Sequence, residues 1–529
     1  DRLYIYIHQD KMAGSRTDAI LESSTGKSIG IVQRLRLFTP SVLFLVIYLS
    51  TAMFNYGYDV GVFSGIQAMT RFKERFGTCN AAGVCAVSSS MSSVMNSTPW
   101  IGKLIGCIAG GHIAARYGRK MTMLLIAVAS LVGVVLQITA TTIAQFTVGR
   151  IICYGMTGVC VLNIPSYMAE TSPPHLRGLI TTQMQIQITM SQLIASLINY
   201  GTKDMVHSDA SWRIPIGVQF IAPVFLIAGW PFVTESPHWL VSKDRIQDAQ
   251  ASLKTLRNSN DEDAIHDAVQ AIVLHRDSQI EGSWQEIFSG VNKRRTGIAI
   301  LAMLGQQITG QAFTNQYGVI FYQQEGYTNS FQLNIISMAI SVVTCLLTSS
   351  VIDGIGRRPL LIIGGFLQAV FLFTVGGLGT ISHRSQTQKN SLVASLMLFS
   401  FAYALSWAPL SYVVLSEAAS RRVVEKTNML AISISVITAF VVSFTVPYLI
   451  NADYAGLGAR VGFIYGSFAV IMAVLAYFII PEMKGRSLEQ LDVLFEKGIS
   501  ARKFRNAVVL DGEVRFETKY PSEEKNPNV

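Results

Sequence analysis

The feature that most constrains this chain is a series of long apolar runs. The hydrocarbon core of a bilayer is about 30 Å thick, so a helix that crosses it needs about 20 apolar residues. Because lipid offers no partners to backbone polar groups, we expect each such run to form an α-helix. Twelve runs meet this description, near 41–64, 91–113, 121–142, 145–167, 179–201, 214–233, 297–321, 331–352, 360–380, 392–416, 427–450 and 462–480.

The composition supports a protein embedded in lipid. Charged residues make up only 14% of the chain, whereas they make up about 25% of a soluble domain. The net charge is +9, and the basic residues stand mainly in short segments between apolar runs. This pattern is typical of cytoplasmic loops beside an anionic membrane surface, so we expect lipid as a partner and both termini in the cytoplasm. No basic face with interleaved aromatic residues is present, so we expect no nucleic-acid binding.

A charged segment divides the apolar runs into two sets of six. Its apolar residues recur at helical spacing, which predicts amphipathic helices on the cytoplasmic side.

We expect no cleavable signal peptide, since the first long apolar run is long enough to cross the whole bilayer. Whether residues 1–11, which precede Met12, are native stays open. We also expect the polar tail to become disordered towards Asn528. The predicted division is a cytoplasmic tail at 1–40, a six-helix bundle at 41–241, a cytoplasmic helical linker at 242–296, a second bundle at 297–480 and a cytoplasmic tail at 481–529.

The two sets of runs also share sequence motifs. GGHIAARYGRK at 110–120 recurs as SVIDGIGRRPL at 350–360, and two acidic residues recur in the same order at nearly the same spacing. Three ordered correspondences predict two halves of common design that meet around a site near the bilayer midplane. The matched pairs are Arg119 with Arg357, Glu170 with Glu417, and Glu235 with Glu482.

These motifs make the chain resemble the sugar-porter family of the major facilitator superfamily, from about residue 50 to 505. The motifs that carry the resemblance are GYDVGVFSG, RYGRK, VGRIICYGMTGV, TESPHWL, QQITGQAF, DGIGRRP and PEMKGRSLEQLDVLF. The runs APLSYVVLSEAASRRVVEKT and YLINADYAGLGAR are most similar to the fungal α-glucoside (maltose-type) proton symporters. Five positions depart from the family pattern, namely Ala115, Thr234, His238, Ala312 and Tyr412.

The resemblance implies an all-α membrane protein of twelve transmembrane helices in two pseudo-symmetric six-helix bundles. It implies a secondary active transporter, a monomer of the plasma membrane, that imports a mono- or disaccharide with a proton by alternating access. The alternatives are a passive sugar facilitator, a non-transporting nutrient sensor and a metabolite exporter. We expect no enzyme activity, no cofactor and no metal site, because neither nucleotide-binding and hydrolase motifs nor zinc-type Cys/His spacings occur.

Asp59 and Arg150 are the candidates for proton coupling. Asp59 lies about 27 Å along its helix from the cytoplasmic end, and Arg150 lies just inside the outer end of the fourth run. A lone charge in a bilayer is costly, so we expect the two side chains to face each other across a cavity. Protonation of Asp59 would then free Arg150 and bias the equilibrium between two conformations. The resemblance supports this role, and a structural ion pair that does not titrate is the alternative.

Carboxamides are the candidate sugar ligands, because they pair with hydroxyl groups and carry no net charge. Two of them open the QQITGQ motif, and another follows Arg177 by eight residues. Tyr317, Tyr412 or Trp407 could stack on a sugar ring, and the small residue Ala312 would enlarge the cavity. The alternative is that these side chains form polar contacts between helices. The predicted substrate-binding residues are Gln185, Gln306, Gln307, Asn315 and Tyr412.

Two sets of charged residues at the cytoplasmic ends of the helices are the candidates for gating. Ion pairs within each set would hold the inner helix ends together in the outward-facing state, whereas solvated charges at the membrane edge are the simpler alternative. The first set is Arg116, Arg119, Glu170, Arg177 and Glu235, and the second is Asp353, Arg357, Arg358, Glu417 and Glu482. Separately, Cys79 and Cys85 share a polar loop on the predicted outer side, where a disulfide is possible.

Overall fold

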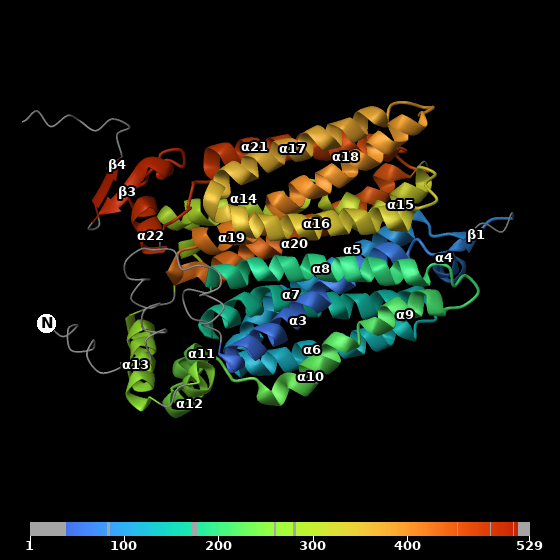
Figure 1. The fold of residues 1–529 in the computed structure, drawn as a ribbon. Coiled ribbons are helices and arrows are strands. Elements are labelled where there is room, and N and C mark those ends of the chain that lie inside the picture. Colours follow the sequence, from blue (N-terminus) through green and yellow to red (C-terminus); the bar gives the residue numbers. More distant parts are fainter. Residues whose placement is uncertain are drawn as a thin grey trace, which may run out of the picture.

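The computed structural model describes residues 39–516, apart from 82–84, 172–176, 259–260, 279–281, 452, 487 and 511–512. Within this part of the chain, helices cross the molecule twelve times and form two bundles of six crossings (Figure 1). The first bundle contains α3 (Pro40–Ile66), α5 (Ser89–Tyr117), α6 (Arg119–Ile138), α7 (Ile143–Thr171), α8 (Arg177–Thr202), and α9 (Ala210–Val218) followed by α10 (Ile221–Gly229). The second contains α14 (Gly290–Ile308) followed by α15 (Gln311–Gln324), α16 (Ser330–Ile355), α17 (Arg357–Leu378), α18 (Gln386–Leu405) followed by α19 (Trp407–Ala418), α20 (Val424–Ile450) and α21 (Val461–Ile479). The predicted fold class is confirmed.

Three of the crossings consist of two helices with a break between them. Gly310 separates α14 from α15 with a φ of 99°, a conformation that glycine adopts without a steric penalty. Ser406 separates α18 from α19 with φ −127° and ψ −93°, three residues before Pro409. A proline in the first turn of a helix costs no hydrogen bond, so the bend lies at Ser406 rather than at the proline.

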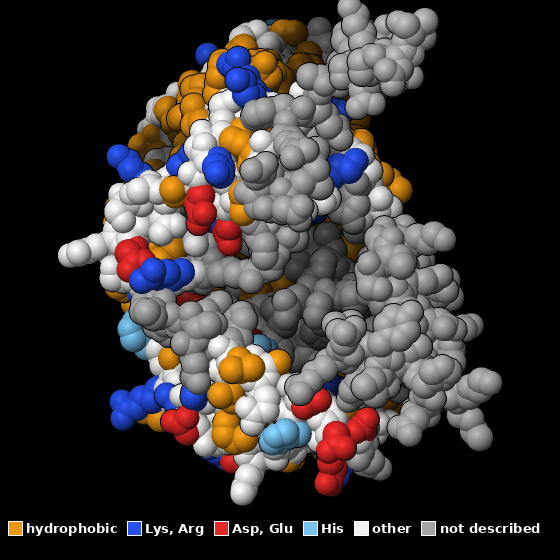
Figure 2. All heavy atoms as spheres, turned by 90° about the vertical axis from the view of Figure 1, so that its left-hand side faces the viewer, with side chains coloured by type: hydrophobic (Ala, Val, Ile, Leu, Met, Phe, Trp, Pro, Cys, Tyr) orange, Lys and Arg blue, Asp and Glu red, His pale blue; other side chains and the backbone are white. Residues whose placement is uncertain are grey.

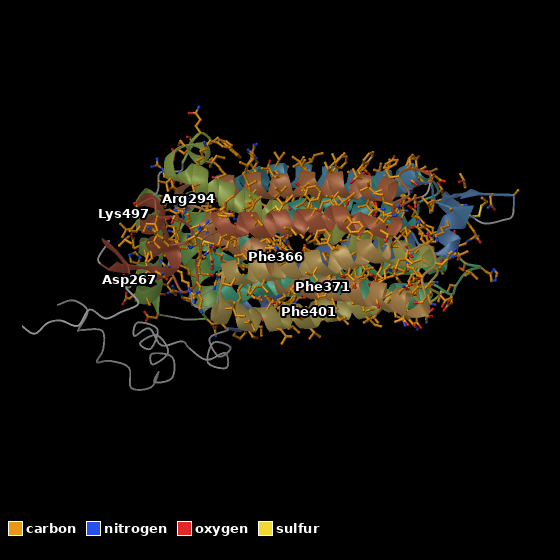
Figure 3. All side chains as sticks on the ribbon, turned by 90° about the horizontal axis from the view of Figure 1, so that it is seen from above. Asp267, Arg294, Phe366, Phe371, Phe401 and Lys497 are labelled. Carbon is orange, nitrogen blue, oxygen red and sulfur yellow. A yellow bond between two sulfur atoms is a disulfide. The ribbon has the colours of Figure 1, made fainter. Side chains whose placement is uncertain are left out.

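Nine crossings in the described residues are both long and apolar enough to span a bilayer on composition alone. The other three are α5, α8 and the α14–α15 pair, whose apolar stretches are interrupted by amides and hydroxyl groups and, in α5, by Lys103. Large apolar side chains on the outer surface, such as Ile105, Val343 and Phe366, are between 44% and 61% exposed. Figure 3 shows Phe366, Phe371 and Phe401 along the middle of the bundle, where lipid would surround them.

The two ends of the molecule carry different elements. At the end that we call the hairpin end lie α4 (Thr70–Phe76) and the hairpin of β1 (Thr78–Cys79) and β2 (Cys85–Ala86) (Figure 1). A disulfide joins Cys79 to Cys85, which confirms the pairing that the sequence allowed.

At the opposite end, which we call the linker end, short helices follow each bundle. The short helices are η3 (Trp230–Phe232), α11 (Pro237–Ser242), α12 (Ile246–Arg257), α13 (Glu262–Ser278), η4 (Glu286–Phe288), η5 (Arg421–Val423), α22 (Leu488–Glu496) and η7 (Phe504–Asn506). A hairpin of β3 (Ala507–Leu510) and β4 (Glu513–Phe516) lies beside them. A further short helix, η6 (Gly458–Arg460), precedes α21. Apolar residues of α11, α12 and α13 pack into one small core, so the linker is helical, as its periodicity predicts. Charged side chains of both signs are scattered over the described part of this face (Figure 2).

Two details differ from the sequence-based boundaries. α14 begins at Gly290, ahead of the predicted start at 297, because the charged first turns around Arg294 extend the helix beyond its apolar part. The tail after residue 481 contains α22 and the β3–β4 hairpin, packed through Phe495 and Phe504 against the second bundle. Residues 517–529 lie outside the described part of the chain.

Candidate functional site

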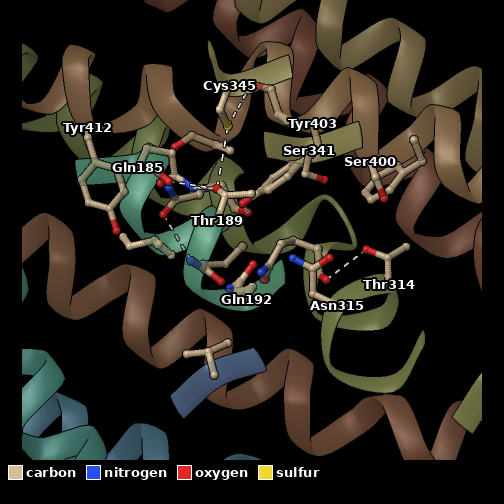
Figure 4. Close-up of a pocket in the computed structure, with 18 of the residues that line it drawn as sticks. Gln185, Thr189, Gln192, Thr314, Asn315, Ser341, Cys345, Ser400, Tyr403 and Tyr412 are labelled. Carbon is tan, nitrogen blue, oxygen red and sulfur yellow. Dashed lines mark hydrogen bonds between the residues drawn. The ribbon is translucent and has the colours of Figure 1, made fainter. Parts of the chain in front are cut away.

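A cavity lies between the two bundles. Its walls come from α3, α5 and α8 of the first bundle and from α14, α15, α16, α18 and α19 of the second. The three crossings that fail the hydropathy criterion therefore supply most of its polar groups. All five predicted substrate-binding residues line this cavity, namely Gln185, Gln306, Gln307, Asn315 and Tyr412 (Figure 4).

The side-chain amides in the cavity differ in how many hydrogen bonds they already make with other protein groups. The Gln306 amide donates to the Ala408 backbone oxygen at 3.0 Å and accepts from Gln307 at 3.2 Å. Among the described residues, the side chain of Gln185 makes only a 3.4 Å contact, from its Nε2 to Thr189 Oγ1. Gln306 therefore also joins α14 to α19, as the interhelical alternative requires, whereas the Gln185 amide is largely available to a ligand.

Sequence reasoning missed several lining residues. Thr189 and Gln192 follow Gln185 on the same face of α8, at the four- and seven-residue spacing of one helix face. Tyr403 also lines the cavity and donates from its hydroxyl to the Gln306 backbone oxygen at 3.0 Å. Helical periodicity counted from Gln185 would have found the first two, but no sequence signal indicates Tyr403.

Three residues that the motifs suggested face elsewhere. Ala312 is 1% exposed and packs in an apolar core with Phe313 and Tyr465. Trp407 is fully buried in a second apolar core, and Tyr317 donates to the Ser443 backbone oxygen at 2.9 Å. Residues 311, 314 and 315 form the cavity face of α15, so position 312 points away from the cavity and a small residue there does not enlarge it.

Asp59 and Arg150 are both buried in the first bundle, at 3% and 2% exposure. They do not form the direct ion pair that we expected: neither is found in a salt bridge within 4.0 Å among the described residues. Asp59 Oδ1 accepts from Gln219 Nε2 at 3.3 Å, and its Oδ2 has no hydrogen-bond partner.

Arg150 is turned towards other groups. Its guanidinium donates to the Met95 backbone oxygen at 2.6 Å and to the Tyr154 hydroxyl at 3.3 Å, and it lies 3.8 Å from the centre of the Phe63 ring. Its Nε has no hydrogen-bond partner. The carbonyl and the aromatic ring take the place of the carboxylate, which leaves both charges incompletely paired inside the protein.

The first charge cluster consists of Arg119, Glu170, Glu235 and Ser236 at the linker end. Arg119 forms an ion pair with Glu170 at 2.9 Å, and the Ser236 hydroxyl donates to Glu170. Glu235 accepts from the backbone N–H groups of Arg119 and Lys120, at 2.8 and 3.1 Å, and so caps α6. Burial raises the pKa of Glu235, although these N–H groups act in the opposite direction.

The second charge cluster, Arg357, Glu417 and Glu482, repeats this arrangement. Arg357 pairs with Glu417 at 2.9 Å. Glu482 accepts from the backbone N–H groups of Arg357 and Arg358, at 3.0 and 3.2 Å, and caps α17. The Arg–Glu ion pair and the glutamate cap on the following helix thus recur in both bundles.

A glycine precedes each capped helix. Gly118 has a φ of 93° and Gly356 a φ of 104°. A Cβ atom at either would lie within 2.6 Å of a capping carboxylate oxygen. Only glycine therefore allows the capping glutamate to approach this closely.

The other predicted gating residues are not members of the two charge clusters. Arg358 donates from its guanidinium to the Tyr477 backbone oxygen at 2.7 Å. Arg116 is exposed, lies 5.4 Å from the Tyr117 ring and joins no ion pair among the described residues. The side chains of Arg177 and Asp353 lie outside the described part of the structure. Between the two bundles, the first charge cluster makes one long contact, from Arg119 to the exposed Glu425 at 3.8 Å.

Close contacts between the bundles gather at the hairpin end. Gln67 donates to the Gln316 backbone oxygen at 2.7 Å and accepts from Asn96 at 2.9 Å. Ser443 donates to the Gln316 side chain at 2.8 Å. We call these four buried residues the hairpin-end latch. The sequence analysis did not single out Gln67, Asn96 or Ser443, because isolated amides and serines at helix ends form no recognisable motif.

Comparisons with known proteins agree with this architecture. A family model described as "Sugar (and other) transporter" matches residues 44–495. The chain is 30% identical over 462 residues to the low-affinity glucose transporter HXT4 of Saccharomyces cerevisiae (strain JAY291), covering 84% of this chain and 79% of that protein. It is 31% identical over 466 residues to the major facilitator-type transporter ecdD of Aspergillus rugulosus, covering 84% and 86%. These relatives do not single out the α-glucoside branch.

Among solved structures, the proton:xylose symporter XylE, bound to 6-bromo-6-deoxy-D-glucose, aligns with a TM-score of 0.69. The alignment covers 86% of this chain and 99% of XylE, at 23% identity. At this identity the likeness shows a shared fold.

Proposed function

The chain belongs to the sugar (and other) transporter family of the major facilitator superfamily, and from this premise we propose that it imports a sugar together with a proton by alternating access. The observation that carries the sugar assignment is the cavity between the bundles. Amide and hydroxyl groups from both bundles converge on it, and these groups can donate to and accept from sugar hydroxyls. A site shared by two bundles that rock against each other is exposed to each side of the membrane in turn.

Proton coupling is assigned to Asp59 and Arg150. Two observations support this proposal. Asp59 has a buried carboxylate oxygen without a hydrogen-bond partner among the described residues, and the Arg150 guanidinium interacts with a backbone carbonyl and an aromatic ring instead of a carboxylate. Protonation would remove the charge of Asp59 and change its interactions with the bundle around it, which couples proton uptake to conformation. The fold neighbour XylE is itself a proton:xylose symporter. A passive facilitator needs no such carboxylate and is the second candidate.

The sidedness of the molecule and the role of the charge clusters belong to the same proposal. The linker end carries the charged helices and the repeated Arg-Glu clusters, so we assign this end to the cytoplasmic side of the membrane. We assign the protein as a whole to the plasma membrane. The clusters tie helix ends together within each bundle, and the hairpin-end latch joins the bundles on the outside. The α-glucoside branch and the monomeric state remain predictions from the sequence.

Uptake into carrier-deficient yeast tests this proposal. Labelled glucose, maltose, sucrose, xylose and quinate are offered with and without a protonophore, and the same yeast without the chain is the control. We expect at least one compound to accumulate above its outside concentration and the protonophore to abolish that accumulation. Uptake that the protonophore leaves unchanged would support the facilitator instead. Uptake of none of the five would contradict an importer and favour a sensor or an exporter.

A further inference from the structure

The buried charges of the membrane-spanning region do not balance. Among the described residues, five charged side chains are buried: Asp59, Lys103, Arg150, Arg295 and Glu482. Arg295 is paired with Asp492, and Glu482 caps α17. The remaining buried charges are one acid, Asp59, and two cations, Lys103 and Arg150. Buried charges in proteins are normally paired, so the interior has one positive charge in excess.

Lys103 is the cation without an acidic partner. It lies on α5, is 4% exposed, and forms no salt bridge within the described residues. Its ammonium donates to the Tyr56 hydroxyl at 2.8 Å and lies 4.2 Å from the Tyr56 ring centre and 5.0 Å from that of Trp100. Besides Tyr56, the titratable groups that act on its charge are Tyr412 on α19, Cys107 on its own helix and Cys160 on α7.

The surroundings of Lys103 connect it to the cavity. Tyr56, Trp100 and Tyr412 all line the cavity, so the ammonium lies one side chain behind its wall. The Tyr56 hydroxyl accepts a hydrogen bond from Lys103 and donates none among the described residues. Its own proton therefore remains available to a ligand, and a hydroxyl that accepts from an ammonium is a stronger donor in a medium of low dielectric constant.

We propose that the preferred substrate is a sugar acid, a polyhydroxylated compound with one carboxylate such as a hexuronate or an aldonate. This inference rests on the proposed function and specifies its substrate class. The amides bind the hydroxyl groups, Tyr56 donates to the carboxylate, and Lys103 balances its charge from behind the wall. The carboxylate supplies the anion that the interior lacks, which a neutral sugar cannot do. Lys103 is accordingly a positioning residue that determines specificity.

Matched pairs of ligands test this directly. D-glucuronate differs from D-glucose, and D-galacturonate from D-galactose, only in the carboxylate that replaces the terminal hydroxymethyl group. Binding to the purified full-length protein in detergent is followed by tryptophan fluorescence, since Trp100 lines the cavity. We expect at least one acid to bind about tenfold or more tighter than its neutral partner, the advantage of a charge-assisted hydrogen bond. Equal or tighter binding of both neutral sugars would overturn the inference while leaving sugar transport intact.

Variants then assign the preference to Lys103. Lys103→Met keeps the length of the side chain and removes its charge, so the preference for the acid should disappear. Lys103→Arg and the exposed-lysine control Lys293→Met should retain it. A Lys103→Met protein that still prefers the acid would overturn the role of Lys103. The comparison of ligand pairs on the unaltered protein needs no variant, so the inference stays testable if Lys103→Met fails to fold. Binding of neither member of either pair would overturn the inference, whereas the sugar assignment itself fails only if the uptake panel is also negative.

Discussion

The side-chain amide of Gln67 donates a 2.7 Å hydrogen bond to the backbone oxygen of Gln316, and this bond joins the first bundle to the second at the hairpin end. Both side chains are buried, at 2% and 4% exposure. Asn96 supports Gln67 from α5, and Ser443 supports Gln316 from α20. Opening the cavity towards the hairpin end requires the bond between Gln67 and Gln316 to break, so the latch sets part of the balance between the two conformations.

Gln67→Met should shift that balance towards the state open at the hairpin end. The variant keeps the volume of the side chain but loses two buried hydrogen bonds, each worth about 1 kcal/mol. Cys345 lines the cavity, so its modification by a small, membrane-impermeant thiosulfonate added from outside reports the opening. Only the bond to Gln316 joins the two bundles, so we expect the rate to rise about fivefold. In the control Gln145→Met, the lost hydrogen bonds lie within the first bundle. An unchanged rate for Gln67→Met would exclude a latch.

Gln185→Leu should weaken substrate binding without destabilising the protein. The Gln185 amide makes only one long contact with the protein, so its removal costs the ligand hydrogen bonds of about 1–3 kcal/mol and should raise KM about tenfold or more. Gln306→Leu should raise KM and also lower the melting temperature, because Gln306 joins α14 to α19. If Gln185→Leu transports with an unaltered KM, Gln185 is not a ligand.

The Cys79–Cys85 disulfide gives a test of sidedness. After treatment of intact cells with a membrane-impermeant phosphine, an impermeant maleimide should label two cysteines, because the remaining four are buried. The double variant Cys79→Ser, Cys85→Ser keeps only the buried cysteines, so it should be labelled much more slowly and serves as the control. Labelling that appears only after the cells are permeabilised would place the hairpin end in the cytoplasm and reverse the assigned topology.

Glu235 should make the stability of the protein depend on pH. Burial raises its pKa above the usual value of a glutamate, so the folded state favours the protonated form more than the unfolded state does. Its stabilising contribution is complete below the usual pKa and is lost as the pH rises through the raised one. The melting temperature of Glu235→Gln, relative to that of the unaltered protein, should therefore increase from about pH 4 to pH 7. The exposed-carboxylate control Glu262→Gln should show a smaller change, and a constant difference for Glu235→Gln would contradict the shift.

Much of the fold follows from local sequence patterns. Run length and hydropathy place the crossings, and the repeat predicts that Glu235 and Glu482 have equivalent positions, which the two capped helices confirm. The same reasoning brought Gln185, Gln306 and Tyr412 to one cavity, because polar residues in apolar helices face the protein interior.

The rest depends on features that a linear pattern does not contain. Helical phase cannot be carried through the break at Gly310, so the orientation of Ala312 could not be predicted. The ion pair expected between Asp59 and Arg150 depends on side-chain rotamers, and Arg150 instead binds the Met95 carbonyl. Lys103 is a single lysine within an apolar run, and its importance emerges only once Tyr56, Trp100 and the cavity surround it.

The central claim, that Asp59 couples sugar movement to the proton gradient, is tested most directly by the accumulation of labelled substrate in cells that express Asp59→Asn. The control Asp204→Asn removes an acid that is 85% exposed in the loop after α8. We predict that Asp59→Asn exchanges preloaded substrate at a normal rate but no longer raises the inside concentration above the outside one, whereas Asp204→Asn still does. Accumulation against a gradient by Asp59→Asn would contradict the account.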